Sequence, residues 1–261
     1  MPDIHTVFLI CIGFFIIAAL YSSAGFGGGS SYLALLSLFI GDFSAIKTAA
    51  LFCNLVVVAG SSYLFMKNGY FDKKKFLPLA ICSIPAAFVA ATIHLSQKSF
   101  FICLGSVLTL SGLLLIMQLY TQTRPAEPGL GNRVSSLPVN AVLGAAAGFL
   151  SGLVGIGGGI LLSPVLNLMS WDTPKKIAAL ASFFILVNSI AGLAGQASGG
   201  TFTFNIQLML PLLTAVFLGG QVGTRLSLKI VRPGLLKALT GVLVAYIGVK
   251  LVLKYTNGID V

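Results

Sequence analysis

Two glycine-rich stretches have the residue types and spacing that suit binding chemistry. Residues 25–30 read Gly-Phe-Gly-Gly-Gly-Ser, and residues 155–159 read Gly-Ile-Gly-Gly-Gly. Glycine disfavours a helix by about 1 kcal/mol relative to alanine, so each stretch is expected to break the helix that contains it. A helix that restarts after a break presents N–H groups without partners and the positive end of its dipole. Helix starts of this kind bind anions.

Together, the two stretches predict an anion site that needs no buried lysine or arginine. The predicted donors are Gly25, Gly27, Gly28, Gly29 and Ser30 in the first stretch and Gly155, Gly157, Gly158 and Gly159 in the second. Nearby hydroxyl groups that could add donors belong to Ser22, Ser23, Ser31 and Ser151. The alternative is structural, because small residues also let two membrane helices cross at close range. The same packing role is expected for Gly144, Gly148, Gly152, Gly219 and Gly223.

Several polar side chains lie inside long apolar segments, where they are costly unless they bond to a partner or line a cavity. Four of them are candidate substrate-binding residues, with bonding between helices as the alternative for each: Asn54, Ser182, Asn188 and Gln221. Arg225 is a further candidate at the end of an apolar segment. It would either attract anions to the mouth of a pathway or anchor its helix at the lipid headgroups.

The composition indicates an all-α polytopic membrane protein. Apolar residues make up 57% of the chain and charged residues 8%, and the mean hydropathy is +1.00. A soluble domain carries about 25% charge, so this chain lacks the residues to cover a water-facing surface. The expected surroundings are a lipid bilayer. The net charge of +10 is then ascribed to cytoplasmic loops, and no nucleic-acid partner is expected.

The hydropathy pattern divides the chain into ten apolar segments. Six reach the roughly 20 residues that cross a bilayer, and the four shorter ones flank the glycine stretches. The approximate ranges are 4–21, 29–41, 46–66, 76–95, 99–120, 138–152, 159–170, 175–195, 206–226 and 234–254. The first segment lacks a basic leader, so we expect it to be retained rather than cleaved as a signal peptide.

The two halves of the chain resemble each other. Asp42 aligns with Asp172, and Ala49-Ala50-Leu51 aligns with Ala178-Ala179-Leu180. Both aspartates are expected to start the helices that follow them. We predict one transport domain over residues 1–261, with a first repeat at 1–120, a polar linker at 121–137 and a second repeat at 138–254. Each repeat would begin with a hairpin broken by glycine.

Loop charges predict that the two repeats are inverted. With loops assigned to alternate sides of ten segments, one side has twelve basic residues: Lys67, Lys73, Lys74, Lys75, Arg124, Arg133, Lys175, Lys176, Arg225, Lys229, Arg232 and Lys237. The other side has only four, namely Lys47, Lys98, Lys250 and Lys254. Cytoplasmic loops carry the basic excess, so both termini are predicted outside the cytoplasm. Full crossings and re-entrant hairpins fit this count equally well. We favour hairpins that enter from opposite faces and meet near the middle of the membrane.

Residues of other chemistries are sparse. All six acidic residues fall in loops or termini, so the sequence has no buried carboxylate relay. The four cysteines are dispersed in apolar runs, which predicts small buried side chains rather than disulfides or metal ligands. There is no nucleophile motif and no phosphate-loop lysine. We therefore expect neither an enzyme nor a cofactor.

At the glycine stretches the chain resembles the sulfite exporter TauE/SafE family of bacterial membrane proteins. The resemblance also includes the duplicated halves and the run from Ala178 to Gly192. It implies transport of small sulfur-containing anions, such as sulfite or organosulfonates, across a bacterial inner membrane. The first half has Phe52-Cys53 where the second has Ala181-Ser182, which argues against a symmetric hydroxyl pair there.

The expected function is therefore a transporter that works by alternating access around the two hairpins, with a small anion as its substrate. An anion channel and a non-transporting membrane assembly factor are the alternatives. The sequence leaves the oligomeric state open, with a homodimer as one option.

Overall fold

The computed structural model describes residues 4–40, 42–121, 137–169, 171–200, 202, 206–229 and 233–257. These ranges form ten α-helices and contain no strand, which confirms the predicted all-α fold. The helices are α1 (Ile4–Ser23), α2 (Gly29–Leu36), α3 (Phe43–Lys67), α4 (Lys73–Ala91), α5 (Gln97–Thr121), α7 (Leu137–Val154), α8 (Gly159–Leu168), α9 (Pro174–Ser198), α10 (Ile206–Lys229) and α11 (Pro233–Asn257). Most of the predicted linker, residues 122–136, lies outside the described residues.

Six described helices are long and apolar enough to cross a membrane, so the protein is a multi-pass membrane protein. One of them, α1, corrects the prediction that the first segment falls short. Its helix continues through the polar pair Ser22-Ser23 and reaches 20 residues. In contrast, α2 and α8 are only 8 and 10 residues long. The shortest helices are thus the two that follow the glycine stretches. The apolar part of α7, Pro138–Val154, also falls short of a span, as predicted.

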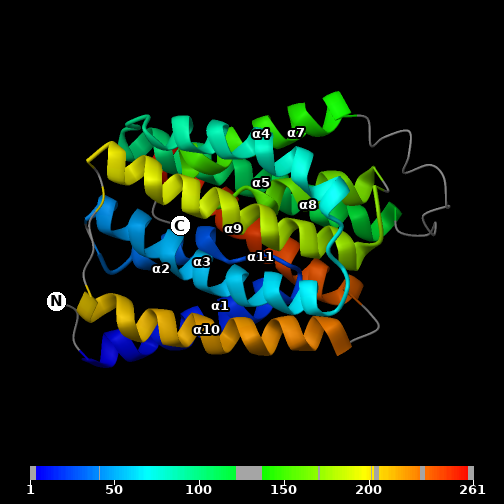
Figure 1. Ribbon diagram of the computed structural model, residues 1–261. Helices are drawn as coiled ribbons and strands as arrows, with labels where there is room; N and C mark the ends of the chain where they lie inside the picture. The colour runs from blue at the N-terminus through cyan, green and yellow to red at the C-terminus, as the bar shows by residue number, and fades with distance from the viewer. Residues whose placement is uncertain are drawn as a thin grey trace.

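The helices of the two halves interleave (Figure 1). The first helix of each half packs along the fourth helix of the other half, so α1 lies on α10 and α7 lies on α4. The two third helices, α3 and α9, contact each other, and so do the two fifth helices, α5 and α11. Neither half therefore forms a separate unit.

Glycines at these crossings remove the side chains that would keep the helices apart, as predicted. A Cβ atom at Gly148 would lie 2.5 Å from the carbonyl oxygen of Ser83, and one at Gly219 would lie 2.9 Å from Cβ of Ala18. Gly144, Gly152 and Gly223 likewise face backbone carbonyls of the neighbouring helix. Such close approach supplies the van der Waals contact that holds membrane helices together.

One end of the helix bundle gathers basic residues. Lys75 at the start of α4 forms an ion pair with Asp172 before α9, with 2.7 Å between Nζ and Oδ2. Lys175 donates to the carbonyl of Leu228 near the end of α10, at 3.3 Å. We call this the basic end. Its other described basic residues, by position along the helices, are Lys67, Lys73, Lys74, Lys176, Arg225 and Lys229.

The opposite end joins the start of α3, the connection between α4 and α5, and the end of α9. Lys47 lies over the Phe100 ring, 5.5 Å from its centroid. His94 Nε2 lies 3.3 Å from the carbonyl oxygen of Gly199, and Tyr255 near the end of α11 stacks on Phe101. We call this the opposite end. The bundle thus separates the described members of the two groups of basic residues that were counted in the sequence, whereas Arg124, Arg133 and Arg232 lie outside the described residues.

The two aspartates differ in role. Asp42 caps α3, as expected, by accepting hydrogen bonds from the N–H groups of Ser44 and Ala45. Asp172 does not cap α9, whose N-cap is Thr173 with Pro174 as its first residue. Burial raises the pKa of Asp172, but the hydrogen bond and charge of Lys75 outweigh it, so this pKa lies below the ordinary aspartate value. Its carboxylate holds α4 and α9 together.

Replacing Asp172 by Asn is expected to lower stability by about 1 kcal/mol at neutral pH, because the pair is partly exposed. The contribution is present above the unfolded-state pKa of about 4 and is lost as pH falls through the lower folded-state pKa. The difference in Tm between wild type and Asp172→Asn should therefore shrink as pH falls below about 4 and vanish once the pH lies below the folded-state pKa. Asp42→Asn, which keeps a capping side chain, is the control. A difference in Tm that does not change with pH would contradict the ion pair.

Candidate functional site

Both glycine stretches break a helix, as predicted. The chain leaves α1 at Ser23 and restarts as α2 at Gly29, and it leaves α7 at Val154 and restarts as α8 at Gly159. The residues that cap the new helices, Gly28 and Gly158, have φ angles of 86° and 71°. This left-handed conformation is costly for residues with a Cβ atom, so glycine is required at both caps.

Each restarted helix turns back along the helix before it. The ring of Tyr32 in α2 stacks on Phe14 in α1 with 4.5 Å between centroids, and Leu35 lies against Gly13. The pairing is antiparallel, so α1 and α2 form a hairpin. Its open side lies at the opposite end of the bundle. The second hairpin is open to the basic end, because α7 runs parallel to α4 and α8 leads to Asp172.

The two broken segments meet at one side chain, Asn54 in α3. Its Oδ1 accepts from the N–H of Gly29 at 3.3 Å, which satisfies the first donor of α2. Its Nδ2 donates to the carbonyl oxygen of Ile156, in the second segment, at 3.4 Å and to Ser189 Oγ at 3.2 Å. Asn54 is fully buried. One amide thus links both glycine segments to α9.

Glycine is also needed where these segments touch α3 and α9. A Cβ atom at Gly27 would overlap Oδ1 of Asn54, and one at Gly157 would overlap Ile185 and lie 2.9 Å from Asn54 Nδ2. Ile185 therefore packs against the second glycine segment as Asn54 packs against the first. The centre of the molecule is asymmetric, with an amide on one side and a hydrocarbon on the other.

The region where the two glycine segments meet at Asn54, which we call the crossing, retains hydrogen-bond donors that have no acceptor in the protein. Within the described residues, no hydrogen bond is donated by the N–H groups of Gly27, Gly28, Gly157 or Gly158. These buried groups lie beside α2 and α8, whose dipoles point their positive ends at them. Unpaired N–H groups in such surroundings cost free energy unless a ligand or water accepts from them.

Two buried hydroxyl groups lie beside the same glycines. Tyr32 Oη would be 3.0 Å from a Cβ atom at Gly28, and Cβ of Ser151 would be 2.9 Å from one at Gly158. Neither hydroxyl has a partner in the described part of the chain. Sequence reasoning included Ser151 as a donor but missed Tyr32, because a tyrosine in an apolar segment reads as core. Its position four residues after Gly28, on the first turn of α2, was the available signal.

The structure gathers some predicted site residues and separates others. Ser182 joins the crossing by donating to the carbonyl oxygen of Gly25 at 3.0 Å, and buried Ser30 lies at the start of α2. Asn188 instead donates to Ser83 Oγ of α4, at 3.1 Å. Gln221 packs against Gly60 between α10 and α3, and Arg225 is exposed. These last three residues hold helices together or face outward.

Lys47 is a cation that sequence reasoning assigned to a loop. Because α3 begins at Phe43, Lys47 lies inside the helix, and its Cε would be 3.4 Å from a Cβ atom at Gly155. It lines a cavity of about 150 Å³ together with Ser44, His94 and Phe100. The second glycine segment therefore has a positive charge beside it. Within the described ranges, no three His, Cys, Asp or Glu residues cluster to hold a metal ion.

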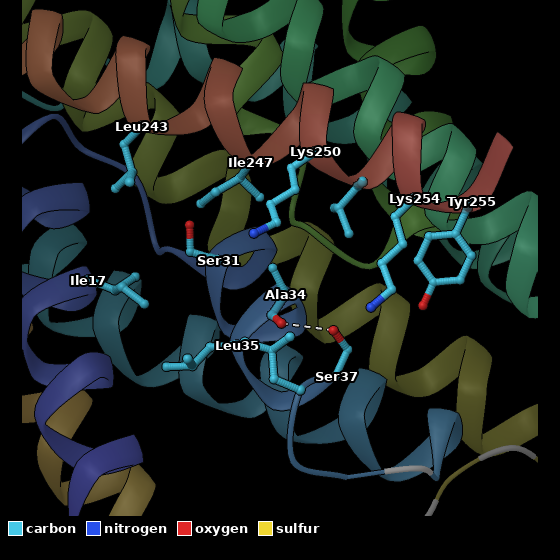
Figure 2. A pocket seen from close by; sticks show the side chains of 12 residues that line it. Ile17, Ser31, Ala34, Leu35, Ser37, Leu243, Ile247, Lys250, Lys254 and Tyr255 are labelled. Carbon is cyan, nitrogen blue, oxygen red and sulfur yellow. Dashed lines mark hydrogen bonds between the residues drawn. The ribbon is translucent and has the colours of Figure 1, made fainter. Parts of the chain in front are cut away.

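A larger cavity, of about 420 Å³, lies between α2 and α11 at the opposite end (Figure 2). It reaches Ser31, two residues beyond Gly29. The corresponding contact of the other half, between α8 and α5, is closed by Gln118. This buried side chain donates to the carbonyl oxygen of Pro164 at 2.8 Å.

This fold defines a class: a multi-pass helical membrane protein with broken helices that meet inside the bundle. The comparisons place it in a family. The model described as "Sulfite exporter TauE/SafE" matches residues 9–251, so the chain belongs to the TauE/SafE family. Membership makes the protein a membrane transporter rather than an enzyme, and it agrees with the resemblance seen in the sequence.

Curated relatives support this assignment along the whole chain. The probable membrane transporter protein y4hK of Sinorhizobium fredii is 32% identical over 250 residues, which cover 93% of this chain and 96% of the relative. The probable membrane transporter protein YunE of Bacillus subtilis is 26% identical over 250 residues, covering 85% and 89%. No solved structure matches this chain.

Proposed function

We propose that this transporter carries small sulfur-containing anions, such as sulfite or an organosulfonate, across the plasma membrane of a bacterium. The observation that carries the proposal is the pair of glycine segments, which bring unused N–H groups and hydroxyls together around Asn54. An anion could accept from these groups and lie near the positive ends of two helix dipoles. The family description adds sulfite as the substrate class to test first.

The arrangement of helices supports two inverted repeats of five segments. If each helix is replaced by its equivalent in the other half, the α1–α10 contact becomes the α7–α4 contact. The α3–α9 and α5–α11 contacts are unchanged by this replacement. The hairpins open to opposite ends, as inverted repeats require. We assign the basic end to the cytoplasm because basic residues concentrate in cytoplasmic loops. Both chain ends then face outward, since α1 begins and α11 ends at the opposite end.

Alternating access is the mechanism that this asymmetry favours. The cavity beside α2 is open, whereas Gln118 closes the equivalent contact beside α8. A state open to the outside fits this difference. If the contact beside α2 closed while the contact beside α8 opened, an anion would be carried from one end to the other. The central amide of Asn54 would stay inside the bundle. Because a transporter changes state at each cycle, its flux saturates with substrate.

The test is flux into liposomes that contain only the purified protein. Sulfite, sulfate, thiosulfate and short organosulfonates should be compared at several concentrations, with empty liposomes as the control. The proposal expects saturable flux of at least one sulfur anion. Flux that never saturates, or single-channel currents, would indicate a channel. Absence of flux for every anion in the series would instead favour an assembly factor.

Alternating access makes a further prediction for Ala34, which lines the open cavity. In a variant without the four native cysteines, Ala34→Cys should react with a water-soluble thiol reagent added at the opposite end. Saturating substrate should slow this reaction severalfold, because bound substrate drives the protein through closed states. A cysteine at Lys98, an exposed residue at the same end, should react at a rate that substrate does not change. Equal rates at Ala34 with and without substrate would contradict the mechanism.

A further inference from the structure

We propose that Lys47 makes the outer approach to the second glycine segment selective for anions. The inference rests on the proposed function and deepens it, because it names the residue that would select the charge of the substrate. Lys47 lines the cavity of about 150 Å³ at the opposite end, together with Ser44 and His94. Such a volume lies below the range of sites for drug-sized ligands, so it fits a small anion. A neutral solute would gain nothing from the ammonium group.

Lys47 is a charged residue inside a membrane span, where charge is costly unless it reaches water or a partner. The span belongs to α3, which begins at Phe43, about one turn before Lys47. A lysine in this position could extend outward to the lipid headgroups. Its stem instead lies along the buried Gly155, where a Cβ atom would be 3.5 Å from Cγ and 3.4 Å from Cε of the lysine. Lys47 therefore points into the bundle.

The ring of Phe100 holds the ammonium group without cancelling its charge. Nζ of Lys47 lies over this ring, 5.5 Å from its centroid, and a cation–π contact leaves the positive charge in place. Asp42, the described acidic residue nearest in sequence, accepts instead from the N–H groups of Ser44 and Ala45. Inside a protein, where the dielectric is lower than in water, a cation acts more strongly on an anion.

The cavity reaches the surface of the opposite end, because two of its lining residues, Ile93 and His94, are exposed. Beside Lys47, the buried Thr48 in α3 donates to Oε1 of Gln196 in α9 at 3.2 Å. The next polar contact between these two helices is the hydrogen bond of Asn54 at the crossing. Polar contacts between α3 and α9 therefore occur both at the cavity and at the crossing.

Comparison of the halves shows that the second glycine segment has a cation where the first has a methyl group. Both α3 and α9 have 25 residues. Lys47, four residues after the start of α3, contacts Gly155. Ala178, four residues after the start of α9, contacts Gly25, with its Cβ 2.8 Å from the position of a Cβ atom there. These contacts pair Lys47 with Ala178, whereas the sequence alignment paired Ala49 with Ala178.

The same pairing of α3 with α9 makes the neighbouring contact asymmetric too. Thr48 corresponds to Ala179, and Gln196 corresponds to Phe65. Ala179 and Phe65 are both buried in an apolar cluster at the basic end. The contact between α3 and α9 is thus polar near the opposite end and apolar near the basic end. Lys47 and its polar neighbours lie on the side from which an anion would enter the outward-open state.

The test is the reaction of a cysteine at Ser44, which lines the cavity, with thiol reagents of opposite charge. The protein lacks its four native cysteines, and the reagents are added at the opposite end. The rate ratio of an anionic to a cationic methanethiosulfonate, divided by the same ratio for a free thiol, should be at least about ten. Lys47→Gln should bring it to about one, and Lys47→Arg should preserve it. Both reagents meet the same thiol, so changes in thiol reactivity cancel.

Two further variants separate Lys47 from the other charges of this end. Lys98→Gln removes an exposed lysine, which solvent screens, and should change the ratio little. Asp3→Asn/Asp260→Asn removes the acidic residues of the two chain ends, which lie outside the described residues, and should also change it little. A ratio that rises above one only in this double variant would show that an acidic residue neutralises Lys47, and would overturn the inference.

Sulfite flux gives a second readout. Lys47→Gln should raise KM by about tenfold and change kcat less, because the charge acts on capture of the anion. An unchanged KM, or a reagent ratio that Lys47→Gln leaves as it was, would overturn the inference. The reagent ratio needs neither substrate nor flux. A protein that shows the ratio but transports no sulfur anion would therefore reject only the proposed function.

Discussion

Leucine at Gly28 is expected to abolish transport while leaving the protein inserted in the membrane. Gly28 caps α2 at φ 86°, and a Cβ atom there would lie 3.0 Å from Ile17 and from the Tyr32 hydroxyl. The larger leucine side chain would push α2 away from Asn54 and displace the donors beside it. Misplacing binding groups by about 1 Å can reduce rates by roughly 100-fold. The measurements are sulfite flux in proteoliposomes and the amount of protein in the membrane.

Gly69→Leu is the matched control for this variant. Gly69 also has a left-handed backbone, with φ 76°, so leucine brings a similar backbone strain. Nothing lies within 4 Å of the position where its Cβ atom would be placed, because Gly69 is in the connection between α3 and α4. Flux should therefore stay near wild type. If Gly28→Leu transported as well as Gly69→Leu, the glycines would serve only helix packing.

Asn54→Leu is expected to have the second large effect, on both stability and transport. Leucine has a similar volume but would remove the hydrogen bonds to Gly29, Ile156 and Ser189. Each buried group left without a partner costs about 1–3 kcal/mol. The two glycine segments would also lose their common contact. Tm should fall by several degrees, and sulfite flux should fall to the level of empty liposomes.

Asn68→Leu provides the comparison for Asn54→Leu. Asn68 follows the same helix, α3, but it is exposed, and its side chain donates to the carbonyl oxygen of Leu64. Its replacement should change Tm little, since exposed substitutions usually alter stability by less than about 0.5 kcal/mol. Wild-type flux by Asn54→Leu would remove Asn54 from the anion site and leave it a purely structural role.

Sequence reasoning could predict the helices and the breaks because both depend on local properties. Hydropathy locates each apolar segment, and consecutive glycines interrupt a helix whatever surrounds them. The error on α1 arose at its end, where Ser22 and Ser23 looked like the start of a loop. Both are buried, and Ser22 donates to the carbonyl oxygen of Gly220 in α10. That partner is distant in sequence, so hydropathy could not reveal it.

The candidate site was harder to predict because it depends on how helices align with one another. Asn54 and Asn188 look alike as buried amides in apolar segments. Only the packing of α3 between the two glycine segments directs Asn54 to the crossing and leaves Asn188 bonded to Ser83. Lys47 was counted as a loop charge because it lies near the start of its apolar segment. Its proximity to Gly155 could not be predicted, because it depends on contact between the halves.

A structure of the protein with bound selenite tests the central claim most directly. Selenite has the shape and charge of sulfite, and its selenium atom can be located by anomalous scattering. We expect selenium between the two glycine segments, within hydrogen-bonding reach of the N–H groups of Gly28 and Gly158. Selenite held elsewhere, with the crossing at Asn54 closed around itself, would contradict the anion site proposed for these segments.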